Sequence, residues 1–193
     1  MTHTRTISGR VRIAGVVLGI LWAGSAGIAD DDPLFAKSRG IAATFAENLQ
    51  AALKEAMASG GPVAAIDVCK DLAPAIASEL SRESGAKVSR TSLRFRNPGN
   101  APEPWQTEVL RMFNDSDTTT EFFERTENNE TRYMKAIPTA SLCLTCHGSE
   151  LPKAIQDRLA RDYPHDRASG YQLGDIRGAF SITWPDPVNK TGH

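Results

Sequence analysis

The segment Cys143-Leu144-Thr145-Cys146-His147 constrains the fold of this chain more than any other part of its sequence. Two cysteines that are separated by two residues and followed at once by a histidine form the attachment signal of a c-type haem. The two thiols add to the vinyl groups of the porphyrin, and the adjacent imidazole binds the iron from one side. A chain with this motif is therefore expected to fold around one flat, largely apolar group that is covalently part of it.

Two other kinds of site share part of this motif. A thiol–disulfide centre of the thioredoxin kind would need a strand before the cysteines and a helix opening after them, whereas Gly148 and a polar stretch follow here. A closed zinc site needs four ligands, and Cys143, Cys146, Cys69 and His165 could supply them. Zinc thus stays an alternative, although the signal for export at the start of the chain, described next, favours covalent haem.

The first 29 residues have the composition of a secretory signal peptide. Three arginines without any acidic residue precede an apolar run at 13–21, and small residues follow up to Ala29. This pattern predicts cleavage after Ala29, which makes Asp30 the first mature residue. The alternative is a retained anchor, but the apolar run is short, since a membrane span needs about 20 residues.

Residues 30–193 are expected to form a single domain with a core of its own. Loss of the three leader arginines leaves this part mildly acidic, so nucleic acid is not an expected partner and strong membrane association is not expected after cleavage. The leader predicts a periplasmic location, where haem is attached after export. A redox or signalling protein, not named by the sequence, is the expected partner, and a small gaseous ligand is a further one.

The chain has three cysteines, and the motif uses two of them. A free, exposed thiol outside the cytoplasm would oxidise or pair with another chain. Cys69 lies on the apolar stripe of a predicted helix with Ile66, which predicts that it faces inward. It is therefore a buried small residue, a metal ligand or a cross-link.

The spacing of apolar residues predicts helices first and antiparallel strands later, which is an α+β fold. Gly60-Gly61 is expected to end the first helix, and Pro74 to interrupt the second. A short helix should carry Trp105, Val109 and Met112 on its buried face. The other expected elements are helices at 33–58, 62–73, 75–84 and 152–163, a strand at 87–96, a hairpin of 121–127 with 131–137 around Asn128-Asn129, and a last strand at 176–184.

Together these residues resemble a family of exported monohaem c-type proteins with a PAS-like fold, some of which are the sensory input of larger signalling proteins. The resemblance is carried by segments spread over most of residues 30–193: Cys69-Lys70-Asp71-Leu72-Ala73-Pro74, Arg90-Thr91-Ser92-Leu93-Arg94-Phe95-Arg96-Asn97-Pro98, Asn100-Ala101-Pro102, Trp105, Tyr133, Pro138, the haem motif with Gly148, Tyr163-Pro164-His165-Asp166, Gly170-Tyr171 and Gly174-Asp175-Ile176-Arg177-Gly178-Ala179.

The resemblance implies a central antiparallel sheet with flanking helices and an unusual iron site. Cys143 and Cys146 would attach the haem, while His147 and Cys69 would be the axial ligands of its iron. The residues alone leave the ligand opposite the motif histidine open. The candidates are Cys69, His165, Met57, Met112 and Met134.

The sequence favours two functions over catalysis, because it shows no nucleophile or acid–base pattern. In addition, two protein ligands would leave no open coordination position on the iron. One function is that of a sensor of redox state or of a small ligand, and the other is that of a low-potential carrier of electrons. A thiolate ligand stabilises ferric iron and predicts a low reduction potential, which suits either one. An arginine on or beside a strand could pair with a haem propionate. The sequence does not choose among Arg90, Arg94, Arg96, Arg132 and Arg177.

Overall fold

The structure is a computed structural model that describes residues 32–116 and 118–186. The predicted signal peptide and its cleavage site at Ala29 lie outside these residues. The described elements, in chain order, are α2 (Pro33–Asp67), η1 (Val68–Leu72), α3 (Ala73–Ser84), β1 (Lys87–Thr91), η2 (Pro98–Asn100), α4 (Pro104–Asp115), β2 (Glu121–Arg125), β3 (Thr131–Pro138), α5 (Ser141–His147), α6 (Lys153–Asp162) and β4 (Ile176–Trp184).

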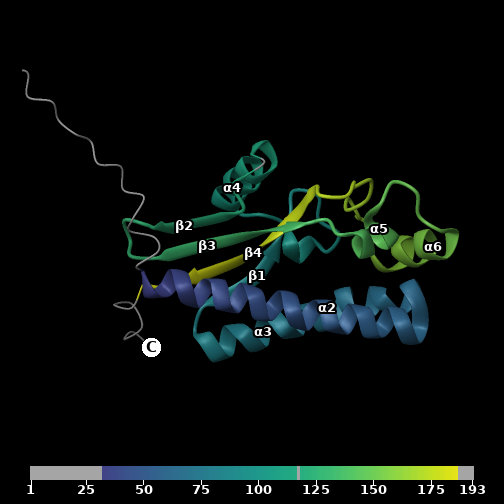
Figure 1. Cartoon of the computed structure of the whole chain (residues 1–193), viewed down its shortest axis with the longest axis horizontal. Coiled ribbons are helices and arrows are strands. Elements are labelled where there is room, and N and C mark those ends of the chain that lie inside the picture. The colour runs from purple at the N-terminus through teal and green to yellow at the C-terminus, as the bar shows by residue number, and fades with distance from the viewer. Residues whose placement is uncertain (1–31, 117, 187–193) are drawn as a thin grey trace, which may run out of the picture.

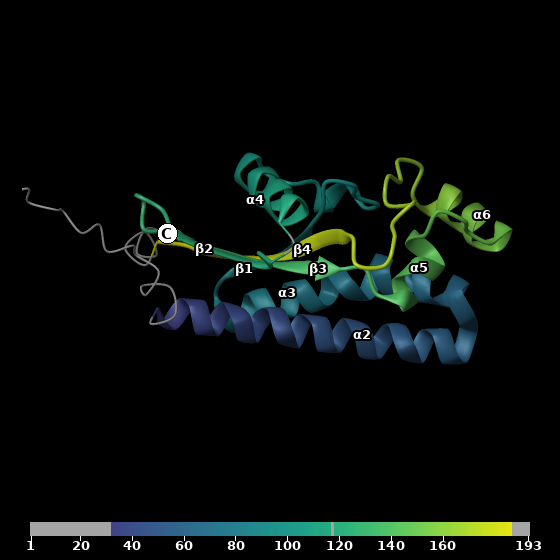
Figure 2. The same cartoon turned by 45° about the horizontal axis from the view of Figure 1, so that its top comes forward.

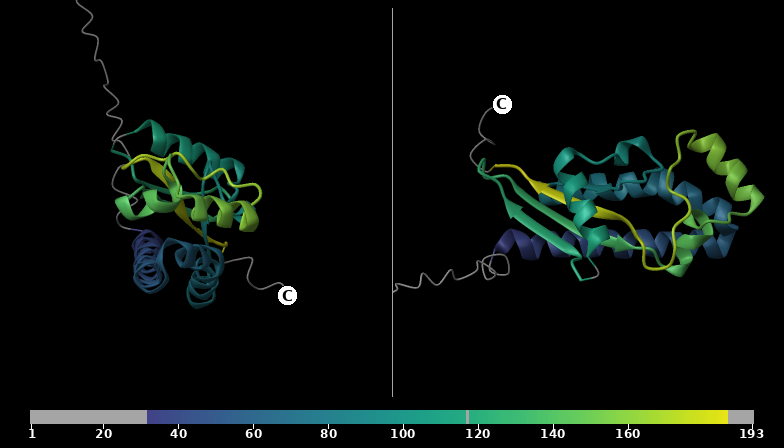
Figure 3. Two further views of the ribbon diagram at one scale, coloured as in Figure 1. Left: turned by 90° about the vertical axis from the view of Figure 1, so that its right-hand side faces the viewer. Right: turned by 90° about the horizontal axis from the view of Figure 1, so that it is seen from above.

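The strands form one antiparallel sheet in the order β1-β4-β3-β2. Helices α2 and α3 cover one face of the sheet and α4 covers the other, while α5 and α6 lie beyond one end (Figures 1 and 2). An end-on view shows α2 and α3 side by side beneath the sheet (Figure 3). The predicted α+β fold with a central sheet and flanking helices is confirmed.

The alternation of side chains along β3 divides the core into two layers. Tyr133 is fully buried against Phe35 of α2, with ring centroids 5.9 Å apart. Its neighbour Met134 is also fully buried, but it packs in the layer that contains Leu110 and Phe113 of α4. Burying each such side chain contributes about 1.5–3 kcal/mol, so both faces of the sheet hold the helices in place.

The first helix is interrupted at the glycine pair, where the sequence predicts its end, and the chain reverses direction there. Gly61 has φ 69° and ψ −169°, a backbone conformation that residues with a Cβ rarely adopt. Pro62 then starts the returning arm, a position that suits proline because its missing N–H is not needed there. The chain thus makes a helical hairpin, whose second arm runs through η1 into α3 under the sheet (Figure 2).

The prediction of a strand over 87–96 is wrong in its second half. β1 ends at Thr91, where the amide of Ser92 donates to Asn100 O (3.1 Å) and its hydroxyl donates to Arg177 O (2.6 Å). These bonds turn the chain out of the sheet, so the alternation does not continue and Leu93 is exposed. Met112 of α4 is likewise exposed rather than buried, since Val109, together with residues 110 and 113, forms the buried stripe.

The remaining predicted elements agree with the structure. The hairpin of β2 and β3 turns at Asn129, which has a positive φ of 57°, and the last strand has the expected bounds, Ile176–Trp184. Within residues 32–116 and 118–186, no helix is long and apolar enough to span a membrane.

Gly178 of β4 gives a test of how β4 packs against the end of β1. A Cβ at this position would overlap the backbone oxygen of Thr91 and lie 3.1 Å from the Cβ of Ser92. We expect Gly178→Ala to lower the free energy of unfolding by about 1–3 kcal/mol, because backbone must move. Urea unfolding measures this change.

The matched control is Gly40→Ala on α2, where a Cβ meets nothing within 4 Å. Alanine favours the helix over glycine by up to about 1 kcal/mol, so this variant should be more stable than wild type. Equal losses in both variants would contradict the close contact at Gly178.

Candidate haem site

A cavity of about 650 Å³ lies between α2, the sheet and α5. Its lining contains each of the residues predicted to bind the haem, namely Cys69, Cys143, Cys146 and His147. A ligand pocket of about 300–1,000 Å³ is typical for a cofactor-sized molecule. The fold therefore brings η1 and α5, which are far apart in the sequence, to one chamber.

The same cavity narrows the choice of a ligand opposite His147. Met57 joins Cys69 in its lining, whereas His165, Met112 and Met134 do not. Met134 is buried under α4, and both Met112 and His165 are exposed. Of the candidates that the sequence left open, only Cys69 and Met57 contact the chamber.

The haem motif forms the short helix α5, which ends directly after its histidine. The amide of Gly148 donates to Leu144 O (2.9 Å), and a Cβ at Gly148 would lie only 2.7 Å from that oxygen. Glycine is required by this close approach rather than by its backbone angles. Cys143, Cys146 and His147 therefore lie within one short helix that ends at the histidine.

His147 is held so that only one ring nitrogen is left for a metal. Its Nδ1 lies 2.6 Å from Ala168 O, and its ring meets Tyr171 edge-on at 6.2 Å. Because a carbonyl can only accept, Nδ1 carries the proton and Nε2 keeps its lone pair. Burial, and then the charges of Arg177 and Arg96, hold the pKa of His147 well below its ordinary value, so the imidazole is neutral.

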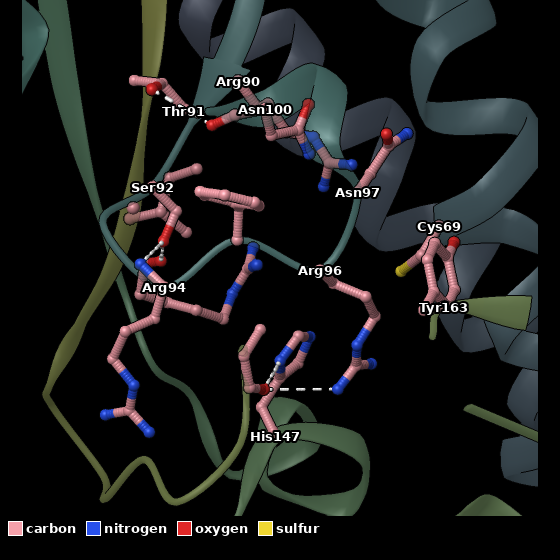
Figure 4. Close-up of a pocket in the computed structure, with 15 residues that line it drawn as sticks. Cys69, Arg90, Thr91, Ser92, Arg94, Arg96, Asn97, Asn100, His147 and Tyr163 are labelled. Carbon is pink, nitrogen blue, oxygen red and sulfur yellow. Dashed lines mark hydrogen bonds between the residues drawn. The ribbon is translucent and has the colours of Figure 1, made fainter. Parts of the chain in front are cut away.

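Cys69 lies in a single turn of π-helix, η1, between α2 and α3. The amide of Ala73 donates to Val68 O, five residues back, which widens the turn. Pro74 follows, and its ring would clash with the carbonyl of Lys70 in a regular α-helix. The interruption predicted at Pro74 is thus a widened turn before the proline, and the half-buried sulfur points from it into the pocket (Figure 4).

Arg96 joins three segments of the chain around His147, a role that the sequence did not reveal. Its Nε donates to Asp166 Oδ2 (3.0 Å), and its Nη2 donates to Cys146 O (2.7 Å) and Ala168 O (3.2 Å). The residue is only 8% exposed. Since Ala168 O also accepts from His147, this guanidinium fixes the acceptor that orients the imidazole (Figure 4).

The lining as a whole fits a haem. Thiols, a neutral imidazole and a further thiol are ligand and attachment groups for its iron and vinyls, and Leu53 and Phe180 supply apolar wall. Arg177 also lines the chamber, and its Nε is buried without a hydrogen-bond partner in the described part of the chain. A buried donor of this kind indicates a missing polar acceptor.

The four ligands that a zinc site would need are not brought together in the described part of the chain. Within residues 32–116 and 118–186, no group of three or more histidine, cysteine, aspartate or glutamate side chains could hold a metal ion. His165, the fourth ligand that zinc would need, is exposed and lies outside the chamber.

The sequence profile of the Tll0287-like family matches residues 30–185. The chain belongs to the Tll0287-like family. The crystal structure of the cyanobacterial heme-protein Tll0287 is also similar, with 27% identity and a TM-score of 0.61, over 80% of this chain and 96% of that one. A search among curated proteins finds no match.

Membership in the Tll0287-like family confirms the resemblance seen in the sequence and agrees with the observed fold. The particular roles assigned to Cys69, Cys143, Cys146 and His147 stay predictions, as do the domain bounds at 30–193. The shared cavity is the structural reason to keep these roles.

The hydrogen bonds of Arg96 lead to a stability prediction. Arg96→Ala leaves the Asp166 carboxylate, whose side chain is 16% exposed, without its cation. Breaking a buried pair on one side costs about 3–5 kcal/mol, so we expect a loss of about 3 kcal/mol in urea unfolding.

Arg94→Ala is the matched control from the same loop. Its exposed guanidinium lies 4.2 Å from the Tyr171 ring centroid, a contact worth about 0.5–1 kcal/mol. If both variants lose the same small amount, Arg96 does not hold the site together.

Proposed function

We propose that this chain is an exported protein with one covalent haem, attached at Cys143 and Cys146, whose iron is bound by His147 and Cys69. The observation that carries the proposal is that all of these side chains line one cavity. The similar solved structure is that of a cyanobacterial heme-protein, which supports it. When bound, the haem would supply a one-electron centre with an axial position for a second ligand.

The proposed role is to sense redox state or a small ligand. Cys69 is the ligand that would respond, because a thiolate binds ferric iron more strongly than ferrous iron. It lies in a widened turn between the Gly61 reversal and Pro74, and π-turns of this kind are often found at functional sites. Release of Cys69 would free this turn to move against the sheet, which is how a partner could read the change.

Electron transfer is the second candidate, and the fixation of His147 favours it. The imidazole is held by Ala168 O, while Arg96 holds both Ala168 and Cys146. A rigid site changes little between oxidation states, as a carrier requires. The two roles differ in one property, which is whether Cys69 stays bound after reduction. The proposal assigns no catalytic residue and no enzymatic activity.

Covalent attachment is the first expected outcome. Purified protein exported by cells that mature c-type haem should keep its colour through denaturing electrophoresis, because thioether bonds survive unfolding. Its intact mass should equal that of the mature chain plus one haem. Colour that leaves the protein band on acid–acetone extraction would refute attachment at Cys143 and Cys146.

Ligation by Cys69 is tested by replacing it. Cys69→Ala should convert the low-spin ferric electron paramagnetic resonance spectrum to high spin, or to that of another ligand, and raise the reduction potential. Met57→Leu is the matched control, since Met57 is the other candidate that lines the cavity and leucine is close to it in size. A spectrum that changes with Met57→Leu and not with Cys69→Ala would move the ligand to Met57.

Carbon monoxide separates the sensor from the carrier. If Cys69 leaves on reduction, the ferrous protein should bind carbon monoxide readily at neutral pH, while the ferric protein should not. The visible spectrum reports this directly. A ferrous protein that stays six-coordinate and inert to carbon monoxide would support the carrier instead.

A further inference from the structure

Two arginines on neighbouring strands line the haem cavity. Arg90 of β1 and Arg177 of β4 both line the large chamber, and both also line a smaller pocket of about 50 Å³ that adjoins it. The two pockets share Cys69 and His147, so the arginines are close to both proposed iron ligands. Figure 4 shows Arg90 on the sheet side of this pocket.

This pair differs from the other cations of the cavity because both members are half-buried and have no anion, whereas Lys54 is exposed to water. Arg39 and Lys135 both form ion pairs with Glu121, and Arg96 is paired with Asp166. In the described part of the chain, neither Arg90 nor Arg177 forms an ion pair with a carboxylate.

The positions of Arg90 and Arg177 in the cavity make their unpaired positive charges unfavourable. The Nε of Arg177 is buried without a hydrogen-bond partner among the described residues. Arg90 lies over the Phe45 ring, 5.9 Å from its centroid, which is a weak substitute for an anion. Burial, and then the charge of Arg177, lower the pKa of Arg90. Both side chains are half-buried, and two guanidinium groups that lie close together repel each other unless a negative group lies between them.

We propose that Arg90 and Arg177 bind a carboxylate, and that a propionate of the haem is its source. A guanidinium offers a planar pair of donors that matches a carboxylate. The inference rests on the proposed function for its ligand, because the haem would bring two carboxylates into this chamber. The pair can receive one of them, whereas Arg39 and Lys135 already share Glu121 as an ion-pair partner.

The closeness of the pair to Cys69 and His147 gives this contact a consequence. The bound carboxylate would cancel positive charge beside both iron ligands. Arg90 and Arg177 would then be positioning residues, which hold the haem edge over the sheet without contacting the iron.

The first arm of the test compares Arg90→Gln and Arg177→Gln in the haem-loaded protein by resonance Raman spectroscopy. Each should shift the propionate bending band, because glutamine donates weaker, uncharged hydrogen bonds. Arg94→Gln is the matched control, since Arg94 lines the same small pocket but its side chain lies on Tyr171. It should keep the wild-type band. Arg177→Lys, which keeps the charge, should fold like wild type and shift the band less than Arg177→Gln.

The second arm adds acetate to the same proteins and follows their melting temperatures. If the haem fills the subsite, acetate should have no effect specific to Arg90 and Arg177. If the Raman band stays fixed while acetate stabilises wild type and Arg94→Gln but not the other two variants, the pair binds a free carboxylate instead. An unchanged band together with no specific acetate effect would overturn the subsite.

The two proposals fail in different ways. Protein that is purified without any haem adduct would contradict the proposed function, and the acetate arm would then decide the carboxylate subsite by itself. Protein with covalent haem and with wild-type behaviour in both arginine variants would leave the haem proposal intact and remove only the subsite.

Discussion

The guanidinium of Arg96 is the interaction on which the site depends. It joins the loop after β1 to Asp166 and Ala168 in the loop before β4, and to Cys146 in α5. A single buried side chain therefore sets the position of both the haem-attachment helix and the carbonyl that orients His147. Charge-assisted hydrogen bonds of this kind are strong and directional, which suits a helix of only 7 residues.

The other side of the cavity depends on backbone rather than on charge. The chain reverses direction at Gly61 between the two arms of the helical hairpin, and the widened turn before Pro74 directs Cys69 toward α5. Small irregularities at two points along one helical arm thus bring the Cys69 thiol to the cavity that His147 also lines. Side-chain hydrogen bonds therefore hold the His147 side of the cavity, whereas an irregular turn of backbone carries Cys69 on the other side.

Much of this arrangement could be predicted from the sequence. Apolar spacing was enough for the two helical arms and the last strand, because it follows the face that each element buries. The end of the first arm and the β2–β3 turn came from Gly60-Gly61 and Asn128-Asn129. Apolar spacing failed at Leu93 and Met112, where alternating or helical spacing continues beyond the buried surface. The end of β1 is decided by hydrogen bonds of Ser92 to distant carbonyls, and no local pattern shows these.

In the site, too, the sequence identifies residues of a local motif but not contacts between distant segments. The motif at α5 is local, so its residues could be named from the sequence. The convergence of Cys69 with it depends on tertiary packing. The odd cysteine made Cys69 one candidate among several, and the family resemblance singled it out. The hydrogen bonds of Arg96 and the unpaired charge of Arg177 involve partners from separate loops and strands, which an arginine in a single sequence does not reveal.

Iron-edge X-ray absorption of the ferric protein decides the proposed ligation, because it identifies the atoms bound to the metal. A haem held between His147 and Cys69 should show one sulfur and five nitrogen neighbours in wild type, with the sulfur lost in Cys69→Ala and kept in Met57→Leu. A wild-type spectrum with six nitrogen neighbours, or with a sulfur that survives Cys69→Ala, would contradict this iron site.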